Sequence, residues 1–203
     1  MPPSENKTTE FSNPRLEARH LLINDDEIAL KGGNRRHFES RLLKNIRAAI
    51  KDLGGSHLQP RFGRFLLRLS SETPLDKVCE RLSRIPGIAV YSPCISTSAD
   101  LDSVRAAMDT IIDQLLARGE QPESFAVVSR RANKELPFTS TDANATIGAH
   151  VQERTGWKVR LKKPQLSLYL FFVNNDCFLA LDRVRGQGGL PTGTTGKVAC
   201  LLS

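Results

Sequence analysis

Apolar residues recur at the spacing of an α-helix in several segments of the chain. The clearest pattern runs from Asn34 to Leu53, and we expect Gly54 to follow its end because glycine readily adopts the left-handed conformation that closes many helices. A second helix is predicted to begin at Thr73-Pro74, with the threonine side chain as its cap and the proline in its first turn. Two more helices are predicted over Asp100–Leu116 and, with a weaker pattern, over Thr141–Thr155.

Alternating apolar and polar residues, or short β-rich runs, predict strands between these helices. In Gly63–Leu69 the apolar side chains fall on one face and two arginines on the other. Leu166–Val173 and Cys177–Val184 flank a run of two asparagines and an aspartate, which is typical of a hairpin turn. Further strands are expected over Ala18–Ile23, Ile88–Ser96 and Phe125–Ser129.

The order of these elements indicates how the chain is organised. Residues 18–96 are predicted to run strand, helix, strand, helix, strand, which fits a small α+β sandwich. Residues 186–196 are rich in glycine, threonine and proline and are predicted to be a linker, and residues 197–202 an apolar strand. Residues 1–17 are polar, so we expect a mobile tail and no signal peptide. We also expect no membrane span, since no stretch approaches the roughly 20 apolar residues required.

Charge is segregated along the chain, which has a formal net charge of +7. Residues 31–68 hold ten Lys or Arg against two acids, and residues 127–163 hold eight against three. Either block could be a solvated face, but the second lies in predicted loops beside Phe138 and Trp157, a combination suited to RNA phosphates and bases. Trp157 alone is more often a core residue. The expected RNA-binding residues are Arg130, Arg131, Lys134, Lys158, Arg160, Lys162 and Lys163, with Lys31, Arg35 and Arg36 from the first block.

No reaction centre is visible in the sequence. The four cysteines and four histidines are scattered without metal-ligand spacing, and no nucleophile motif is present. The segment Gly193–Lys197 resembles a phosphate-binding loop, but Pro191 stands where the first glycine should be, and Val198 replaces the Ser or Thr that would hold magnesium. The sequence therefore offers no candidate catalytic or metal-binding residue, and reduced thiols are the simplest expectation for the cysteines.

Several segments together resemble the tRNA 4-thiouridine synthases, also called tRNA sulfurtransferases. Each segment alone is a weak signal, but their order and spacing from about Leu21 to the last residue are specific. The segments are Glu27–Arg35, Arg84–Ile88, Arg130–Lys134 with Pro137-Phe138, Thr155–Val159, Gly188–Gly193 and Gly196–Val198.

The resemblance implies a fold of mixed α+β and α/β character. It comprises a tail (1–17), a small ferredoxin-like domain (18–86), a THUMP RNA-binding domain (87–184), and a linker that leads into a PP-loop ATPase domain (185–203). The first two domains would bind tRNA, with THUMP holding the acceptor end. A PP-loop domain would use ATP, with Mg²⁺, to adenylate a uridine before a persulfide delivers sulfur. The resemblance also implies cytoplasmic location, a cysteine desulfurase as sulfur donor and a role in thiamine synthesis, and it leaves a homodimer open.

The family's PP-loop extends beyond Ser203, so only its first serine falls within this sequence. We therefore expect this chain to bind tRNA, to catalyse nothing alone and to hold no ATP by itself, with Leu201 and Leu202 as a remnant of the nucleotide site. Two other interpretations stay open: a THUMP module of another RNA-modifying enzyme, such as a methyltransferase, and a stand-alone RNA-binding adaptor.

Overall fold

The chain forms two compact units in a computed structural model that describes residues 16–25, 34–61, 63–132 and 135–194. The first unit contains Ile23–Tyr91 and also the segment that begins at Val184. The second contains Ser92–Arg183 together with the residues just before Ile23. The boundaries therefore fall inside two strands, and the segment after the second unit belongs to the first.

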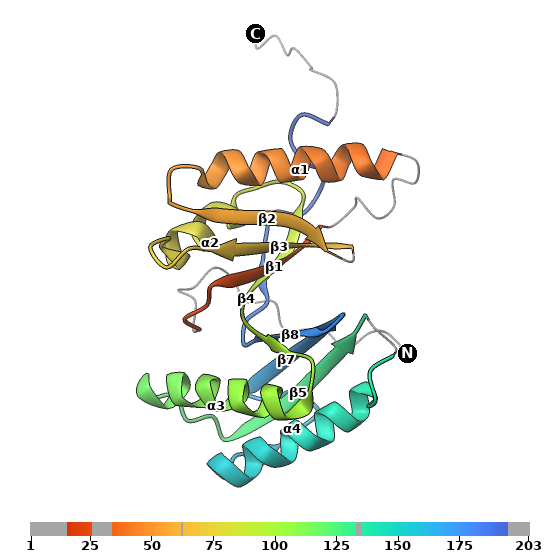
Figure 1. The fold of residues 1–203 in the computed structure, drawn as a ribbon. Coiled ribbons are helices and arrows are strands. Elements are labelled where there is room, and N and C mark those ends of the chain that lie inside the picture. Colours follow the sequence, from red (N-terminus) through yellow and green to blue (C-terminus); the bar gives the residue numbers. More distant parts are fainter. Residues whose placement is uncertain (1–15, 26–33, 62, 133–134, 195–203) are drawn as a thin grey trace. The chain divides into compact units, whose positions relative to one another are not determined.

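The first unit follows the order strand, helix, strand, strand, helix, strand (Figure 1). This is the split βαβ arrangement of ferredoxin-like domains, with the strands in the order β2-β3-β1-β4. Its elements are β1 (His20–Asp25), α1 (Arg35–Ile50), β2 (Ser56–Arg61), β3 (Arg64–Leu69), α2 (Leu75–Ser83) and β4 (Ile88–Ser98).

The helices of this unit follow the predicted apolar stripes, but one predicted cap is wrong. Leu42, Ile46 and Ile50 of α1 are buried, as the helical spacing predicts. Helix α2 begins one residue later than expected, with Pro74 as its N-cap and no side-chain cap. Thr73 is buried instead, and its hydroxyl donates to the Gly55 carbonyl oxygen at 2.9 Å. The threonine thus ties two loops together and does not cap the helix.

The second unit places two helices on one side of its strands (Figure 1). Strand β5 pairs in parallel with β6 and β7, while β7, β8 and the second half of β4 pair antiparallel, giving the order β4-β8-β7-β5-β6. The elements are α3 (Leu101–Ala117), β5 (Ser124–Arg131), α4 (Ser140–Thr155), β6 (Lys158–Val159), β7 (Leu166–Val173) and β8 (Asp176–Ala180).

Local sequence signals set the ends of the elements in this unit. The Asp100 side chain accepts a hydrogen bond from the Ser103 amide at 2.8 Å, which confirms the predicted start of α3. Thr139 and Asp142 form a reciprocal capping box at the start of α4. The hairpin between β7 and β8 turns at Asn174, whose positive φ of 53° suits asparagine.

The described part of the predicted linker packs against the first unit. Strand β9 (Val184–Arg185) pairs with β4, and the amides of Gly186 and Gly188 donate to carbonyl oxygens of β4 at 2.9 and 2.7 Å. A side chain at Gly186 would meet the Ile88 carbonyl oxygen at 2.3 Å, so only glycine fits this approach. We call residues 184–194 the strap.

Candidate nucleic-acid interface

The basic residues that the sequence grouped together occupy opposite ends of β5. Arg130 and Arg131 are the last two residues of β5, whereas Lys158 lies opposite Ser124, the first residue of that strand. Seven steps of roughly 3.3 Å along a strand separate the two ends by about 23 Å. The second basic block is therefore two separate clusters.

Arg131 is held by the protein itself. Its guanidinium donates to the carbonyl oxygens of Leu136, at 3.3 Å, and Phe138. We expected both arginines to bind RNA, but only Arg130 is exposed, while Arg131 is half-buried. The register explains this difference, because neighbouring strand residues point to opposite faces and Arg131 lies on the face of α4 and the loop before it.

The second cluster lies on the connection between α4 and β7. Lys158, Arg160, Lys162 and Lys163 are all exposed, and none has a side-chain hydrogen bond or ion pair within the described residues. Leu161 between them is 81% exposed. Lys163 has a φ of 52°, which a non-glycine residue adopts at a cost and which occurs often at functional sites. We call Lys158–Lys163 the basic loop.

Much of the positive charge on α1 is already bound. Arg35 pairs with Glu39 at 2.7 Å, Arg41 donates to the Thr192 carbonyl oxygen at 3.1 Å, and Arg47 donates to that of Leu58 at 2.9 Å. Arg36 is exposed at the first turn of the helix. The basic block at α1 is thus partly a set of internal contacts.

Neither aromatic residue near these clusters forms an exposed stacking platform. Trp157 is 7% exposed and packs edge-on against Phe125, with ring centroids 6.4 Å apart. Phe138 is half-buried and packs edge-on against the buried Phe172. The interpretation of Trp157 as a core residue is confirmed, and its alternative role beneath an RNA base is wrong.

One further cation carries no signal in the sequence. Arg183 is half-buried, and its guanidinium carbon lies 5.8 Å from the centre of the Tyr169 ring. Burial lowers the pKa of this guanidinium, and the positive charge of Arg130 lowers it further. A lone arginine after a strand has no periodicity or motif that would single it out, so only the fold reveals its position over the Tyr169 ring.

Four residues that the sequence analysis assigned to RNA or nucleotide binding lie outside the described part of the chain. They are Lys31, Lys134, Leu201 and Leu202.

The described residues show no arrangement suited to catalysis. Cys79, Cys94 and Cys177 are buried free thiols, and burial raises the pKa of the last two. Within the described ranges, no group of three His, Cys, Asp or Glu could hold a metal ion. In the same residues, no helix has the length and apolar character needed to cross a membrane.

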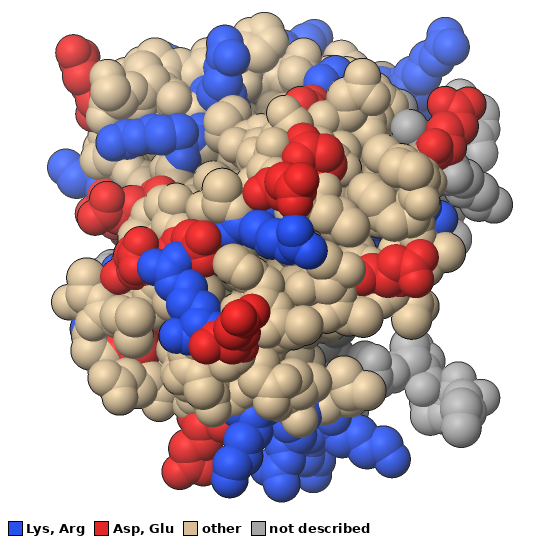
Figure 2. Space-filling model, turned by 60° about the horizontal axis from the view of Figure 1, so that its bottom comes forward, with Lys and Arg blue, Asp and Glu red and all other residues tan. Residues whose placement is uncertain are grey.

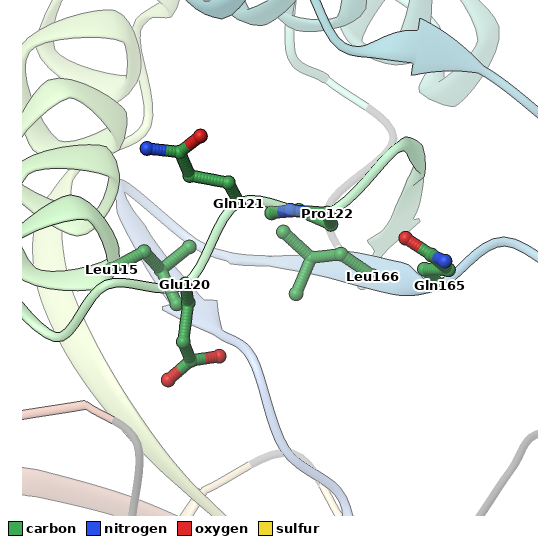
Figure 3. Close-up of a pocket in the computed structure, with 6 residues that line it drawn as sticks. All are labelled: Leu115, Glu120, Gln121, Pro122, Gln165 and Leu166. Carbon is green, nitrogen blue, oxygen red and sulfur yellow. The ribbon is translucent and has the colours of Figure 1, made fainter.

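A pocket of about 270 Å³ lies at the start of β7 (Figure 3). Leu115, Pro122 and Leu166 form its apolar walls, and Glu120 and Gln121 point to different sides of the connecting chain. The Glu120 carboxylate pairs with the Arg118 guanidinium at 3.6 Å. Glu120 is the one acid among the lining residues, so the pocket offers no acid–base pair. The lining residues also include no nucleophile.

The charge on the face that Figure 2 shows is mixed over most of its area. In the view of Figure 2, Lys and Arg mostly alternate with Asp and Glu, and one group of Lys and Arg gathers with few acids at the lower edge. Paired cations on the helices include Arg154, which bonds to Asp109 and, at 2.7 Å, to Asp113. Such pairs join α3 to α4 and leave little charge for a partner.

Comparisons with known proteins agree with the two units. Residues 20–92 match the family model of the ThiI ferredoxin-like domain, and residues 98–182 match that of the THUMP domain. A probable tRNA sulfurtransferase of Natranaerobius thermophilus is 36% identical over 188 residues, which are 91% of this chain and 46% of that protein. The chain thus spans about half the length of the curated relatives it matches.

Solved structures give the same result. A crystal structure of a 4-thiouridine synthetase–RNA complex with bound ATP superposes with a TM-score of 0.74 at 28% identity, covering 88% of this chain and 44% of that one. The protein PH1313 from Pyrococcus horikoshii Ot3 has a TM-score of 0.76 at 23% identity, over 86% of this chain and 58% of its own, and supports the fold alone.

Proposed function

Because the chain belongs to the tRNA sulfurtransferase family, carrying its ThiI ferredoxin-like domain and a THUMP domain, we propose that it binds tRNA for a sulfur-transfer reaction. The observation that carries this proposal is the basic loop. Its four cations are exposed and have no acidic partner in the described residues, so they are available to RNA phosphates. Arg130, at the other end of β5, is exposed and similarly available.

The basic loop acts through charge and not through base recognition. The described aromatic residues nearest to it are packed inside the protein, so they cannot stack on bases. Phosphate contacts position an RNA without reading its sequence. The proposed loop therefore contributes affinity and orientation, and shape would select tRNA.

Salt dependence of binding tests this proposal. Each neutralised phosphate releases bound cations, so affinity falls as salt rises. We expect the triple variant Lys158→Gln, Arg160→Gln, Lys162→Gln to bind tRNA more weakly and to reduce the log–log salt slope by roughly two to three. Fluorescence anisotropy with labelled tRNA at several salt concentrations measures both quantities.

A control variant must remove the same charge elsewhere. Lys77→Gln, Arg105→Gln, Arg118→Gln lowers the net charge equally at helix and helix-end positions, of which Lys77 and Arg118 are exposed and Arg105 is half-buried. We expect its slope to stay near that of the unaltered chain. Equal slopes for the two triple variants would mean that net charge, and not the basic loop, drives binding, and would contradict the proposal.

We extend the proposal to the whole protein by analogy with its relatives. It would use ATP with Mg²⁺ to activate a tRNA uridine and would receive sulfur from a cysteine desulfurase, with a further role in thiamine synthesis. The RNA and the ATP in the related synthetase structure support the RNA and nucleotide parts of this extension. Complementation of a strain that lacks 4-thiouridine, followed by mass analysis of its tRNA nucleosides, tests the activity.

A further inference from the structure

Arg130 and Arg183 lie on the same face of the second unit's strands. Arg130 lies opposite Phe171 in the parallel pairing of β5 with β7, so both side chains point to one face of these strands. Tyr169 is two residues earlier on β7 and therefore shares that face. The Tyr169 and Phe171 rings are parallel within 10°, and the Arg183 guanidinium lies over the Tyr169 ring.

This face is the opposite one to that of α4. A side chain at Gly148 of α4 would contact Val127, which alternates with Arg130 along β5. The loop before α4 likewise packs on Phe172, the neighbour of Phe171. Arg130 and Arg183 are thus separated from the capping box and from the loop that Arg131 holds.

Two cations that share one face of the strands and lack a carboxylate partner are costly unless an anion binds. Neither Arg130 nor Arg183 has an ion pair or a side-chain hydrogen bond in the described residues. Arg183 is half-buried, so water only partly solvates its charge, and the attraction of the Tyr169 ring compensates modestly. Repulsion from Arg130 disfavours the charged form of Arg183, as burial does. An oxyanion between the guanidinium groups would relieve both costs.

We propose that Arg130, Arg183 and the Tyr169 ring form a phosphate-binding site, which takes a phosphodiester group of bound RNA. The planar guanidinium suits this ligand because its parallel N–H groups can donate to two phosphate oxygens at once. The ring holds Arg183 in place, so little side-chain entropy is lost on binding. This inference rests on the proposed tRNA binding, but the site itself can be tested without RNA.

The first arm of the test uses inorganic phosphate and the 203-residue chain. The Nε–H signal of Arg183, assigned by its loss in Arg183→Lys, is followed by NMR during a phosphate titration with chloride as the matched anion. We expect a saturable shift with phosphate and none with chloride. No saturable shift of either the Arg183 or the Arg130 signal, combined with no effect in the RNA arm, would overturn the site.

The second arm uses tRNA and the variant Arg183→Gln. Losing one charged phosphate contact should weaken binding about tenfold or more and reduce the salt slope by roughly one. Arg183→Lys keeps the charge but not the paired donors, so it should retain the slope and lose part of the affinity. Arg105→Gln removes the same charge from α3 and should leave binding nearly unchanged. Melting curves show whether each variant is folded.

The two arms separate this inference from the proposed function. If the unaltered chain shows no tRNA binding while phosphate shifts Arg183, the proposed function fails and the phosphate site stands. If phosphate shifts Arg183 but Arg183→Gln binds tRNA normally, the ligand is a free phosphate compound and the assignment to RNA is wrong. If Arg183→Gln is folded and neither arm changes, there is no phosphate site.

Discussion

Arg41 in α1 donates a hydrogen bond from its Nε to the carbonyl oxygen of Thr192, a residue 151 positions later in the chain, at 3.1 Å. Asn45, one turn further along the helix, donates to the same oxygen at 3.1 Å. A single carbonyl of the strap is therefore held by two side chains of α1. This relationship turns a segment with the composition of a linker into part of the first unit.

Arg41→Ala should loosen the strap. Loss of one exposed hydrogen bond costs about 0.5–1 kcal/mol, so local opening near Thr192 should become several-fold more frequent. Proteolysis within the strap measures this as a faster cutting rate under native conditions. Lys44→Ala is the matched control, because Lys44 is exposed on the same helix without a described partner. Equal cutting rates in the two variants would show that Arg41 does not hold the strap.

Gly193→Ala should destabilise the same contact from the other side. Gly193 has a φ of 83°, and a Cβ there would lie 1.9 Å from the Arg41 guanidinium. The left-handed conformation alone costs an alanine roughly 1 kcal/mol, and the arginine must also move away. We expect faster proteolysis than in Arg41→Ala. The double variant with Arg41→Ala should recover part of the loss, since the steric conflict is then absent, and no recovery would argue against the contact.

Arg130 and Arg131 should behave differently when each is replaced by alanine. Arg131 donates to two backbone carbonyls of the loop before α4, so Arg131→Ala should lower the free energy of unfolding by about 1–3 kcal/mol. Arg130 has no described hydrogen bond, so Arg130→Ala should change it by less than about 0.5 kcal/mol. Urea denaturation measures both values. Similar losses in the two variants would contradict the assigned roles.

The ion pair of Asp52 with Arg81 should make stability depend on acidic pH. Hydrogen bonds from the Arg81 guanidinium, supported by a backbone hydrogen bond, lower the pKa of Asp52 from 3.8 to about 2. Because the folded pKa lies below the unfolded one, the stabilisation is complete above pH 3.8 and is lost as the pH falls towards about 2.

Asp52→Asn should therefore flatten the decline of stability in that pH window. Chemical denaturation at a series of pH values measures the slope. Glu72→Gln, at an exposed position without a described ion pair, is the control and should keep the slope of the unaltered chain. A slope that is the same in both variants would mean that the ion pair does not contribute to folding.

Sequence patterns predicted the helices well because each helix carries its own signal. The apolar stripe of α1 is continuous, and Asp100 supplies a strong cap for α3. Strand β2 was missed, since only Leu58 of its six residues is buried and Pro60 lies within it. Its pairing with β3 exists only once the strand order has formed. The two-residue strand β6 was missed for the same reason.

The sequence by itself determined the family resemblance, the two-part organisation and the presence of many basic residues. These properties depend on the order of short motifs and on local periodicity, which can be read along the chain. Only the tertiary structure decided which cations are available. Strand register placed Arg130 and Arg131 on opposite faces and separated both from the basic loop by the length of β5. It also placed Arg183 over the Tyr169 ring, on the face that carries Arg130, because contacts between distant residues arise from pairing and packing and not from spacing in the sequence.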